Sequence, residues 1–281
     1  MGSEYMDYTN AVSKPMIKSF RINTLKASIG DLNGVFDMVH VPWCDDAFFT
    51  SDDVGNSLEH FLGLIYVQEA ASMLAAKALM PAGGDLVLDL CAAPGSKTTQ
   101  LAALMGNTGA IVANEIDWKR LKTLRFNLNR MGVVNTVLTH SDGTSFSSDA
   151  RFDKILVDAP CSNLGQLSDN PEAGKSFNKS LVKRCSTLQK RLLDNAIKHL
   201  KPGGTLVYST CTYTVEENEE VVDYAVGKYG LKIEEVVGDF KSCGGIISGG
   251  GNVFSKDVSK TTRIYPHHNG THGFYLAKLK K

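Results

Sequence analysis

The chain has 281 residues, 43% of them hydrophobic and 21% charged, so it can bury the core of a globular protein with one or two domains. No apolar stretch is long and clean enough to span a bilayer, because the nearest one, residues 61–67, runs on into Gln68, Glu69 and Lys77. The formal net charge is zero, so RNA or DNA would have to be bound by local basic patches rather than by the field of the whole protein.

The cysteines and the first residues bear on the compartment. The six cysteines include no C-x-x-C pair, which argues against a zinc ribbon. Residues 1–14 contain no apolar block of the kind found in a secretory signal. We therefore expect a cytoplasmic protein with reduced thiols and no membrane partner.

The first part of the chain predicts a small α+β appendage, residues 1–57. Residues 18–26 alternate apolar and polar side chains and predict a strand on a half-buried sheet. Residues 31–38 predict a short helix. Residues 58–80 follow with helical spacing, and we expect this helix to lead the second domain, residues 58–281.

The rest of the chain alternates short apolar strands with helices. This alternation predicts an α/β fold with a parallel, doubly wound sheet and right-handed crossovers. The strands are predicted at residues 86–90, 110–114, 136–139, 154–157, 205–209 and 274–279, and the helices at residues 97–105, 118–131, 181–200 and 216–228.

A turn of small residues, Ala92-Ala93-Pro94-Gly95, joins the first of these strands to a helix. Doubly wound folds hold a nucleotide-like cofactor at such a turn, because small side chains let the backbone approach the ligand and the helix start offers unpaired N–H groups. Glu115 ends the next strand about twenty residues later, where an acid can accept hydrogen bonds from ribose. The turn lacks G-x-G-x-x-G, so a dinucleotide is not favoured. An ordinary βα turn followed by a surface acid is the alternative.

Two further acids, Asp142 and Asp158, come at the ends of the next strands. Because ligands lie outside the carboxyl ends of parallel strands, we expect these acids to converge with Glu115 on the crevice that the turn opens. Asp142 is suited to accept from an adenine amino group. Asp158 precedes Ala159-Pro160-Cys161 and is expected at the edge of the reaction site.

Cys161 and Cys211 each follow a predicted strand and are expected at the same rim of the sheet. Small polar neighbours can leave them exposed enough to act as thiolates. From the residues alone, the two thiols are a redox pair, a covalent catalyst with a helper, or a coincidence. Cys185 shares an apolar helix stripe and Cys91 ends a strand, so both are expected to pack.

Histidines cluster near the end of the chain, in His267-His268-Asn269-Gly270-Thr271-His272. Pro266 and Gly270 make helical spacing of His268 and His272 unfavourable, and no carboxylate is near them in the sequence. We expect a loop histidine cluster and no metal site.

Together these motifs resemble the Nop/Sun class of RNA cytosine-5 methyltransferases, which use S-adenosylmethionine. The resemblance implies a class I, Rossmann-like methyltransferase fold with a small N-terminal α+β appendage that binds RNA. It covers residue 18 to the C-terminus and rests on RINTLK (21–26), QEAASM (68–73), the cofactor turn, DAPCS (158–162), STCT (209–212) and RIYPHHNGTHGFY (263–275).

The same resemblance implies the roles of the site residues. Cys211 corresponds to the nucleophile, and Cys161 to the cysteine that assists release of the product. Ser96 stands where a glycine is commoner, and residues 166–175 differ from the family's arginine-bearing stretch. The residues implied to bind S-adenosylmethionine are Cys91, Ala92, Ala93, Pro94, Gly95, Ser96, Lys97, Glu115, Arg120, Asp142 and Asp158.

The reaction that the resemblance implies is methylation of C5 of cytosine in RNA. Cys211 would add to C6, while Asp158 acts at N3. The compact chain resembles tRNA-modifying members more than ribosomal ones, so a monomer acting on tRNA is favoured over one acting on rRNA. Two alternatives remain open: an RNA-binding member without turnover, and a small-molecule methyltransferase in which both cysteines are structural.

RNA binding also requires positive charge. Lys18, Arg21 and Lys26 alternate along the predicted N-terminal strand and are the favoured phosphate contacts. The basic faces of the helices at residues 118–131 and 181–200 are more simply explained as solvated surfaces.

Overall fold

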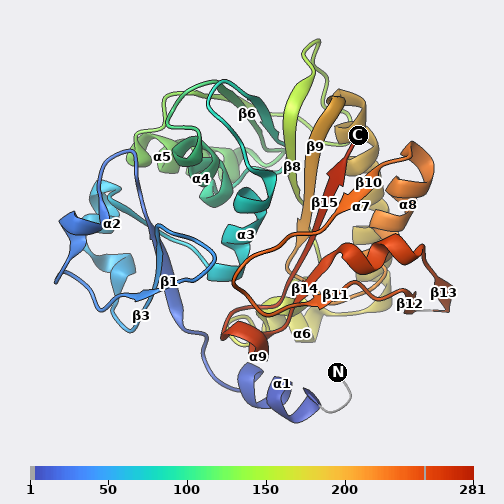
Figure 1. Ribbon diagram of the computed structural model, residues 1–281, viewed down its shortest axis with the longest axis horizontal. Coiled ribbons are helices and arrows are strands. Elements are labelled where there is room, and N and C mark those ends of the chain that lie inside the picture. The colour runs from blue at the N-terminus through green and yellow to red at the C-terminus, as the bar shows by residue number, and fades with distance from the viewer. Residues whose placement is uncertain (1–3, 250) are drawn as a thin grey trace.

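Nine strands form the central sheet of the computed structural model, which describes residues 4–249 and 251–281 (Figure 1). Five neighbouring strands run parallel, and the last strand of the chain pairs antiparallel with one edge of that set. This confirms the predicted doubly wound α/β fold. In spatial order the strands are β7 (Thr136–Thr139), β6 (Ala110–Asn114), β5 (Leu86–Asp89), β8 (Phe152–Asp158), β9 (Leu200–Thr210), β15 (Phe274–Lys280), β14 (Thr262–Ile264) and β11 (Cys243–Gly244), and β10 (Lys232–Glu234) also pairs with β15.

Helices cover both faces of this sheet (Figure 1). Successive strand residues point to opposite faces, so buried Val87 packs in the core under α3 and α4, whereas Leu88 packs in the core under α7 and α8. The helices on the first face are α3 (Ala70–Leu79), α4 (Ser96–Leu104) and α5 (Trp118–Met131), and those on the second are α7 (Lys179–His199) and α8 (Glu219–Tyr229).

Several predicted elements have the bounds expected from the sequence: the strands at residues 110–114 and 136–139 and the helix at residues 118–131. One strand is longer, because β9 begins at Leu200 rather than at residue 205.

Short elements lie around the ends of the strands. The short elements are α1 (Tyr5–Val12), α6 (Glu172–Ser176), α9 (Pro266–Asn269), the 3₁₀ turns η4 (Leu164–Gln166) and η5 (Lys256–Lys260), and the strand pair β12 (Ser248–Gly249) and β13 (Asn252–Val253).

A separate antiparallel sheet forms the N-terminal unit. Its order is β2 (Val39–His40), β3 (Ala47–Thr50), β1 (Lys18–Ile22) and β4 (Ile65–Val67), with η2 (Ile29–Leu32), η3 (Val54–Asn56) and α2 (Leu58–Leu62) beside it. Since β4 pairs with β1, this unit extends beyond residue 57, where the sequence places its end.

The continuous helix predicted over residues 58–80 is wrong. Gly63 ends α2 in the left-handed conformation, with φ 72°, and a Cβ there would lie 2.1 Å from the backbone oxygen of Arg130. The apolar spacing serves two different cores: Ile65 packs in the N-terminal sheet, and Met73 packs against the central sheet.

The predicted helix over residues 31–38 is also wrong. Only the 3₁₀ turn η2 forms there, and the chain then passes through Gly34 at φ 78°, which a continuing helix cannot accommodate.

Arg21 joins the N-terminal unit to α4 and is not a phosphate contact, contrary to the expectation from its strand. Its side chain is fully buried. It donates to the side chain of Gln68 at 2.8 Å, to the hydroxyl of Thr99 at 2.5 Å and to the carbonyl of Ser96 at 3.0 Å. The ammonium of Lys26 likewise donates to two backbone carbonyls. The guanidinium of Arg21 therefore fixes the N-terminal unit against α4 and cannot reach RNA.

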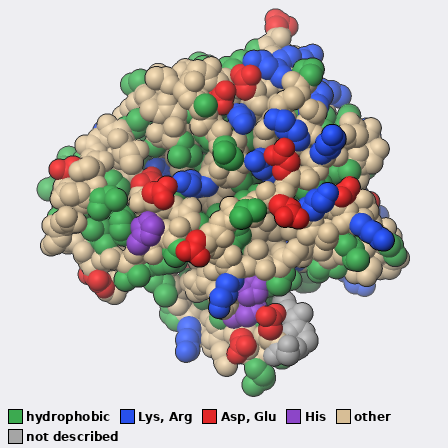
Figure 2. Space-filling view, viewed as in Figure 1, with side chains coloured by type: hydrophobic (Ala, Val, Ile, Leu, Met, Phe, Trp, Pro, Cys, Tyr) green, Lys and Arg blue, Asp and Glu red, His purple; other side chains and the backbone are tan. Residues whose placement is uncertain are grey.

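The surface has no single dominant charge. Figure 2 shows basic and acidic side chains interspersed over one face, and the formal net charge of the chain is zero. Among residues 4–249 and 251–281, none of the helices combines the length and apolar character needed to cross a bilayer.

Candidate active site

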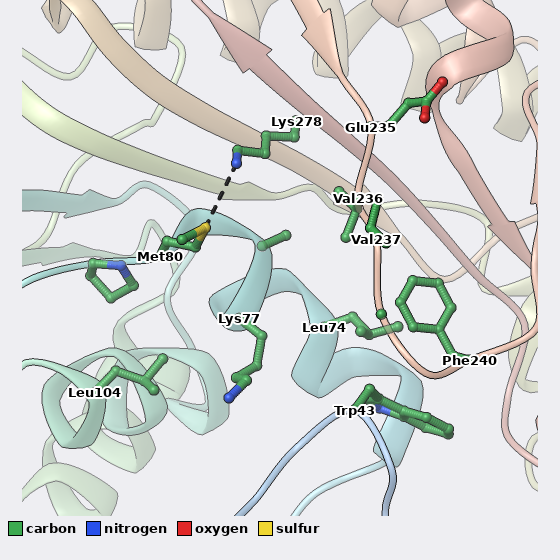
Figure 3. A pocket seen from close by; sticks show the side chains of 13 residues that line it. Trp43, Leu74, Lys77, Met80, Leu104, Glu235, Val236, Val237, Phe240 and Lys278 are labelled. Atoms are coloured by element: carbon green, nitrogen blue, oxygen red, sulfur yellow. Dashed lines mark hydrogen bonds between the residues drawn. The ribbon is translucent and has the colours of Figure 1, made fainter.

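Two cavities are candidates for the functional site. The first, of about 520 Å³, lies between α3 and the chain that follows β10 (Figure 3). Apolar side chains such as Trp43, Leu74 and Phe240 line it, together with Lys77 and Lys278. It contains none of the site residues predicted from the sequence, so we place no chemistry there.

The second cavity, of about 580 Å³, opens at the carboxyl ends of β5, β8 and β9. This is where ligands bind in open α/β sheets. The predicted site residues that line it are Cys91, Ala93, Pro94, Ser96, Lys97, Arg120, Asp158, Cys161 and Cys211.

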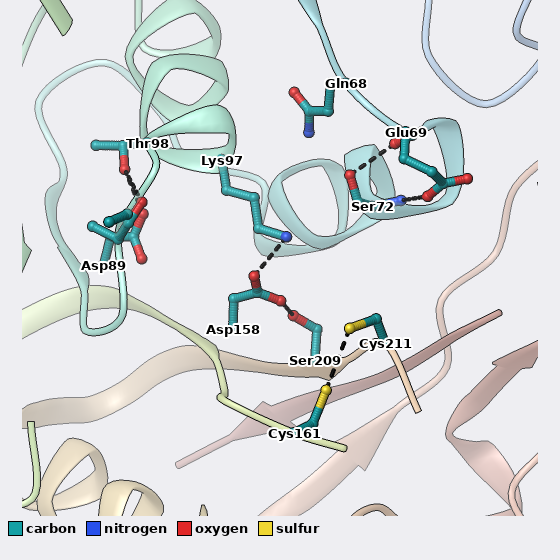
Figure 4. Close-up of polar contacts among 12 residues, drawn as sticks. Gln68, Glu69, Ser72, Asp89, Lys97, Thr98, Asp158, Cys161, Ser209 and Cys211 are labelled. Atoms are coloured by element: carbon teal, nitrogen blue, oxygen red, sulfur yellow. Dashed lines mark hydrogen bonds and ion pairs between the residues drawn. The ribbon is translucent and has the colours of Figure 1, made fainter. Parts of the chain in front are cut away.

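Cys161 and Cys211 meet in this cavity (Figure 4). Cys161 lies in the loop after β8, and Cys211 directly follows β9, which pairs with β8. Their Sγ atoms are 3.3 Å apart. The side-chain oxygen of Asn163 accepts a hydrogen bond from each thiol, at 3.5 Å from Cys161 and 3.0 Å from Cys211. The two thiols therefore form one unit with a shared acceptor.

The environment of Cys161 favours its neutral form. The hydrogen bond with Cys211, together with burial, raises the pKa of the Cys161 thiol well above its ordinary value. Cys161 is thus held as a neutral thiol at physiological pH. Burial also raises the pKa of Cys91 well above its ordinary value, which fits the packing role expected for that residue.

Asp158 and Lys97 form an ion pair beside the thiols (Figure 4). The ammonium of Lys97 donates to one carboxylate oxygen at 2.7 Å, and the hydroxyl of Ser209 donates to the other at 2.7 Å. Burial lowers the pKa of Lys97, but the Asp158 carboxylate outweighs burial and the net pKa is raised. Lys97 therefore carries a positive charge inside the cavity.

The cofactor turn has the expected form. Gly95 caps α4 at φ 107°, and a Cβ there would lie 2.9 Å from the Cδ1 of Leu124. The positive φ favours glycine here, and any side chain would also have to displace Leu124. The turn itself carries no large side chain, so its cavity side is open to a ligand.

Four predicted cofactor residues are not among those that line the cavity: Ala92, Gly95, Glu115 and Asp142. Glu115 is 3% exposed and lies 3.5 Å from the guanidinium of Arg120. That guanidinium also donates to the carbonyl of Ala93 at 2.5 Å. Asp142 is exposed, and the N–H of Thr144 donates to it at 2.8 Å, which lowers the pKa of its carboxyl.

Asn114 fixes the ends of three strands around Glu115. Its amide donates to the carbonyls of Leu90 and Ser141, and its oxygen accepts from the hydroxyls of Thr139 and Ser141. The loops that carry Cys91, Glu115 and Asp142 are thereby tied together, as the strand-end argument predicts.

Glu217 fixes the two cysteine loops and was not predicted from the sequence. Its side chain is fully buried and accepts from Ser162, next to Cys161, and from Thr214, after Cys211. Gln189 on α7 donates to it as well. In the sequence, Glu217 stands in the acidic run EENEE, which predicts a solvated helix start and gives no signal of burial.

A third segment closes the cavity beside the thiols. His272 lies in the cavity wall, where its ring nitrogen Nε2 contacts the carboxylate of Asp169 at 2.7 Å. The backbone N–H of His272 donates to the carboxylate of Glu69 at 3.0 Å. Asn163 and Glu69 are site residues that were not predicted from the sequence, although the motif QEAASM contains Glu69. His272 belongs to the histidine cluster and to the motif RIYPHHNGTHGFY, but its place in the cavity wall was not predicted.

Fold and cavity together define a Rossmann-like methyltransferase. Residues 76–280 match the family model described as 16S rRNA methyltransferase RsmB/F, and residues 1–70 match the N-terminal domain of 16S rRNA methyltransferase RsmF. The chain belongs to this RsmB/F (Nop/Sun) family, which confirms the resemblance seen in its motifs.

Relatives span both tRNA and rRNA enzymes. The chain is 42% identical to the tRNA (cytosine(49)-C(5))-methyltransferase of Pyrococcus abyssi, over 95% of this chain and 89% of that protein. It is 38% identical to the ribosomal RNA small subunit methyltransferase F of Vibrio cholerae, over 99% of this chain and 60% of that protein. The chain therefore spans about three fifths of the length of the ribosomal relative.

Solved structures agree with the fold. A methyltransferase homolog protein from Pyrococcus horikoshii superposes with a TM-score of 0.88 at 37% identity, over 100% of this chain and 91% of that one. NSun6 from Pyrococcus horikoshii, solved with SFG, superposes with a TM-score of 0.84 at 25% identity, over 99% of this chain and 94% of that one.

Proposed function

We propose that this protein methylates C5 of cytosine in RNA, with S-adenosylmethionine as the methyl donor. The observation that carries the proposal is the pair of thiols 3.3 Å apart, beside the Lys97–Asp158 ion pair, in one cavity at the strand ends. The relative from Pyrococcus abyssi is named for cytosine C5 methylation, which supports the same chemistry here.

The residues at the turn fit this cofactor. One carboxylate oxygen of Asp89 is buried at the end of β5 without a hydrogen-bond partner in the described part of the chain. The adjoining turn has small side chains and leads into the N-terminus of α4. The NSun6 relative was solved with SFG, an analogue of S-adenosylmethionine, which also supports this assignment.

Residues of this chain would hold the cofactor in two groups. The loop from Cys91 to Lys97 borders it, with Asp158 at the reacting end. Glu115, Asp142 and Arg120 complete the site at the nucleoside end, and the 54% exposed Arg120 can move aside to free Glu115. When bound, the cofactor supplies an electrophilic sulfonium methyl group.

Cys211 is the nucleophile in this proposal. C5 of cytosine is a poor nucleophile until a thiolate adds to C6 and N3 gains a proton, which turns C5 into an enamine carbon. The Lys97–Asp158 pair can supply that proton. C5 then takes the methyl group. A base removes the C5 proton, the electron pair of that C–H bond expels the Cys211 sulfur from C6, and N3 returns its proton to the Lys97–Asp158 pair.

Cys161 assists that release. Its thiol is held neutral and faces the Sγ of Cys211 at 3.3 Å, so it can donate a hydrogen bond as the Cys211 sulfur regains its electron pair. A neutral thiol is a poor base, so the geometry favours help in elimination over removal of the C5 proton.

We favour tRNA as the substrate. The tRNA-modifying relative is 42% identical to this chain, whereas the ribosomal relative is 38% identical. The N-terminal unit is assigned to RNA binding, because its Tyr66 and Val67 line the cavity beside the thiols. The target base must leave its stack to reach this cavity.

A denaturing gel for protein–RNA adducts tests the proposal. Wild type, Cys161→Ala and Cys211→Ala are incubated with S-adenosylmethionine and total tRNA, with Cys185→Ala as the matched control because that thiol lies on α7. We expect an adduct that accumulates in Cys161→Ala and is absent from Cys211→Ala. Loss of the adduct only in Cys161→Ala would instead make Cys161 the nucleophile. A parallel set is incubated with 16S rRNA, and an adduct in that set but not with tRNA would show that rRNA is the substrate.

A further inference from the structure

His267 is an unusual histidine for its surroundings. Its side chain is 8% exposed, stacked on the ring of Tyr265 and edge-on to Tyr8 of α1. Neither ring nitrogen has a hydrogen-bond partner among residues 4–249 and 251–281. A buried polar group without a partner costs free energy. The ring nitrogens of His267 are therefore available to bind a ligand from outside the protein.

Two other ligand atoms converge on it. A carboxylate oxygen of Glu4 lies 3.7 Å from the Nε2 of His267. The ring of His268 lies beside that of His267, with centroids 4.5 Å apart. One ligand atom from each of Glu4, His267 and His268 lies within 4.8 Å of the other two.

The ligand atoms lie slightly further apart than around a bound Zn²⁺, at 3.7 Å for Glu4 and His267 and within 4.8 Å for all three, so small side-chain movements would close the site. Zn²⁺ binds imidazole nitrogen and carboxylate oxygen at about 2.0–2.2 Å in a tetrahedron, which places neighbouring ligand atoms roughly 3.5 Å apart. The contacts of His268 with its surroundings are long, 3.4 Å from the N–H of Tyr265 and 3.8 Å from the thiol of Cys243, so a metal can compete for the ring. The sulfur of Cys243 is a nearby source of a fourth ligand.

We propose that Glu4, His267 and His268 bind one divalent cation of the zinc class where α1 meets α9. Figure 2 shows histidine and acidic side chains gathered in this region of the molecule. Nitrogen and carboxylate ligands with a thiol alongside select Zn²⁺ over Mg²⁺ or Ca²⁺, which prefer oxygen alone. The site is separate from the thiol cavity and does not depend on the proposed function.

The cation would join two distant parts of the chain. Glu4 immediately precedes α1, whereas His267 and His268 lie on α9, which leads directly to His272 and Gly273 in the cavity wall. Binding therefore ties the N-terminal helix to the segment that closes the active-site cavity. A ligand that binds only this folded arrangement also raises the thermal stability of the chain.

Titration of the chelator-treated full chain with Zn²⁺ tests the site, with Co²⁺ as a spectroscopic substitute. We expect one equivalent of metal, a tetrahedral Co²⁺ absorption and a higher melting temperature with Zn²⁺. Glu4→Gln and His268→Gln should each weaken binding at least tenfold, because even residues behind metal ligands contribute about that much. His40→Gln, which changes an exposed histidine of β2, is the matched control and should bind as wild type.

The active-site thiols are the main competing metal ligands, so Cys161→Ala/Cys211→Ala is titrated in parallel. Unchanged stoichiometry and affinity in that variant support the proposed site. The proposal is overturned if the thiol variant loses the metal while Glu4→Gln/His268→Gln retains it. It is also overturned if wild type binds Zn²⁺ no more tightly than Glu4→Gln/His268→Gln.

Discussion

Ser162 and Glu217 are joined by two hydrogen bonds, from the backbone N–H at 3.0 Å and from the hydroxyl at 2.6 Å, one to each carboxylate oxygen. Ser162 directly follows Cys161, and Glu217 lies six residues after Cys211. The same carboxylate also accepts from Thr214 at 2.8 Å. The separation of the two thiols is therefore set by a buried acid that takes no direct part in the chemistry.

Replacement of Glu217 by alanine should destabilise the protein by about 3 kcal/mol, because several buried donors lose their acceptor together. Glu217→Gln should cost less, since one amide oxygen still accepts. Urea unfolding measures both. Glu216→Gln, at the less buried neighbouring position, is the control, and equal stability of Glu217→Ala and that control would contradict the role of the carboxylate.

Asp158 and Lys97 should act as one unit. Asp158→Asn leaves the 10% exposed ammonium of Lys97 without its carboxylate, and we expect methyl transfer to fall by about 10²–10⁴-fold. Lys97→Met should have an effect of similar size. Both groups are needed to deliver the same proton to N3. Once one group is removed, removal of the other should cause no further loss, so the double variant should be no slower than the slower single variant.

Single-turnover methylation rates of the four proteins measure this coupling. Ser209→Ala removes the other donor to Asp158 and leaves the ion pair in place, so it should be the mildest change. If the fold-loss of rate in the double variant equals the product of the fold-losses in the two single variants, Lys97 and Asp158 act independently.

Gly165 should tolerate no side chain. It donates to the carbonyl of Cys211 at 2.8 Å and accepts from the N–H of Gly273 at 2.9 Å. A Cβ on it would lie 2.3 Å from the oxygen of Gly273 and 2.8 Å from that of Cys211. Gly165→Ala therefore has to separate two walls of the cavity, at a cost of about 1–3 kcal/mol, and adduct formation should fall with it.

Gly227→Ala is the control for that change. Gly227 lies in α8, and a Cβ there would meet no atom within 4 Å, so alanine should stabilise the helix by up to about 1 kcal/mol. Thermal melts and adduct yields of the two variants give the comparison. Normal adduct yield in Gly165→Ala would mean that the close approach of these loops is not required.

The central sheet could be predicted because its information is local. The strand at residues 110–114 and the helix at residues 118–131 are fixed by apolar periodicity, and the strand-end rule then brings Cys161 and Cys211 to one rim. Periodicity does not show which core an apolar residue joins. Ile65 and Met73 continue one helical pattern in the sequence and pack in different cores.

The rest of the site depends on contacts between distant residues. Arg21 alternates along its strand like a surface residue, yet Gln68 and Thr99 receive its hydrogen bonds inside the protein. Asn163 bridges the thiols only because its own loop takes a left-handed turn at φ 59°. Glu4 reaches His267 from the other end of the chain, so no local pattern reports it.

Asp89 should give the protein a measurable dependence of stability on pH. Burial raises the pKa of its carboxyl from 3.8 to about 7, against the hydrogen bond that Thr98 donates at 2.7 Å. Because the folded-state pKa lies above the unfolded one, the folded state holds the proton more tightly. Its contribution to stability is complete below 3.8 and is lost as the pH rises to about 7.

Asp89→Asn removes this titration at nearly constant shape. Between about pH 5 and pH 7, wild type should lose about 2 kcal/mol of unfolding free energy relative to Asp89→Asn. Urea unfolding without cofactor across this range measures the difference, and Asp149→Asn, at an exposed acid, is the control. Parallel pH curves for wild type and Asp89→Asn would mean that the carboxyl titrates as an ordinary surface acid. In that case a charged Asp89, rather than a neutral one, would face the cofactor turn.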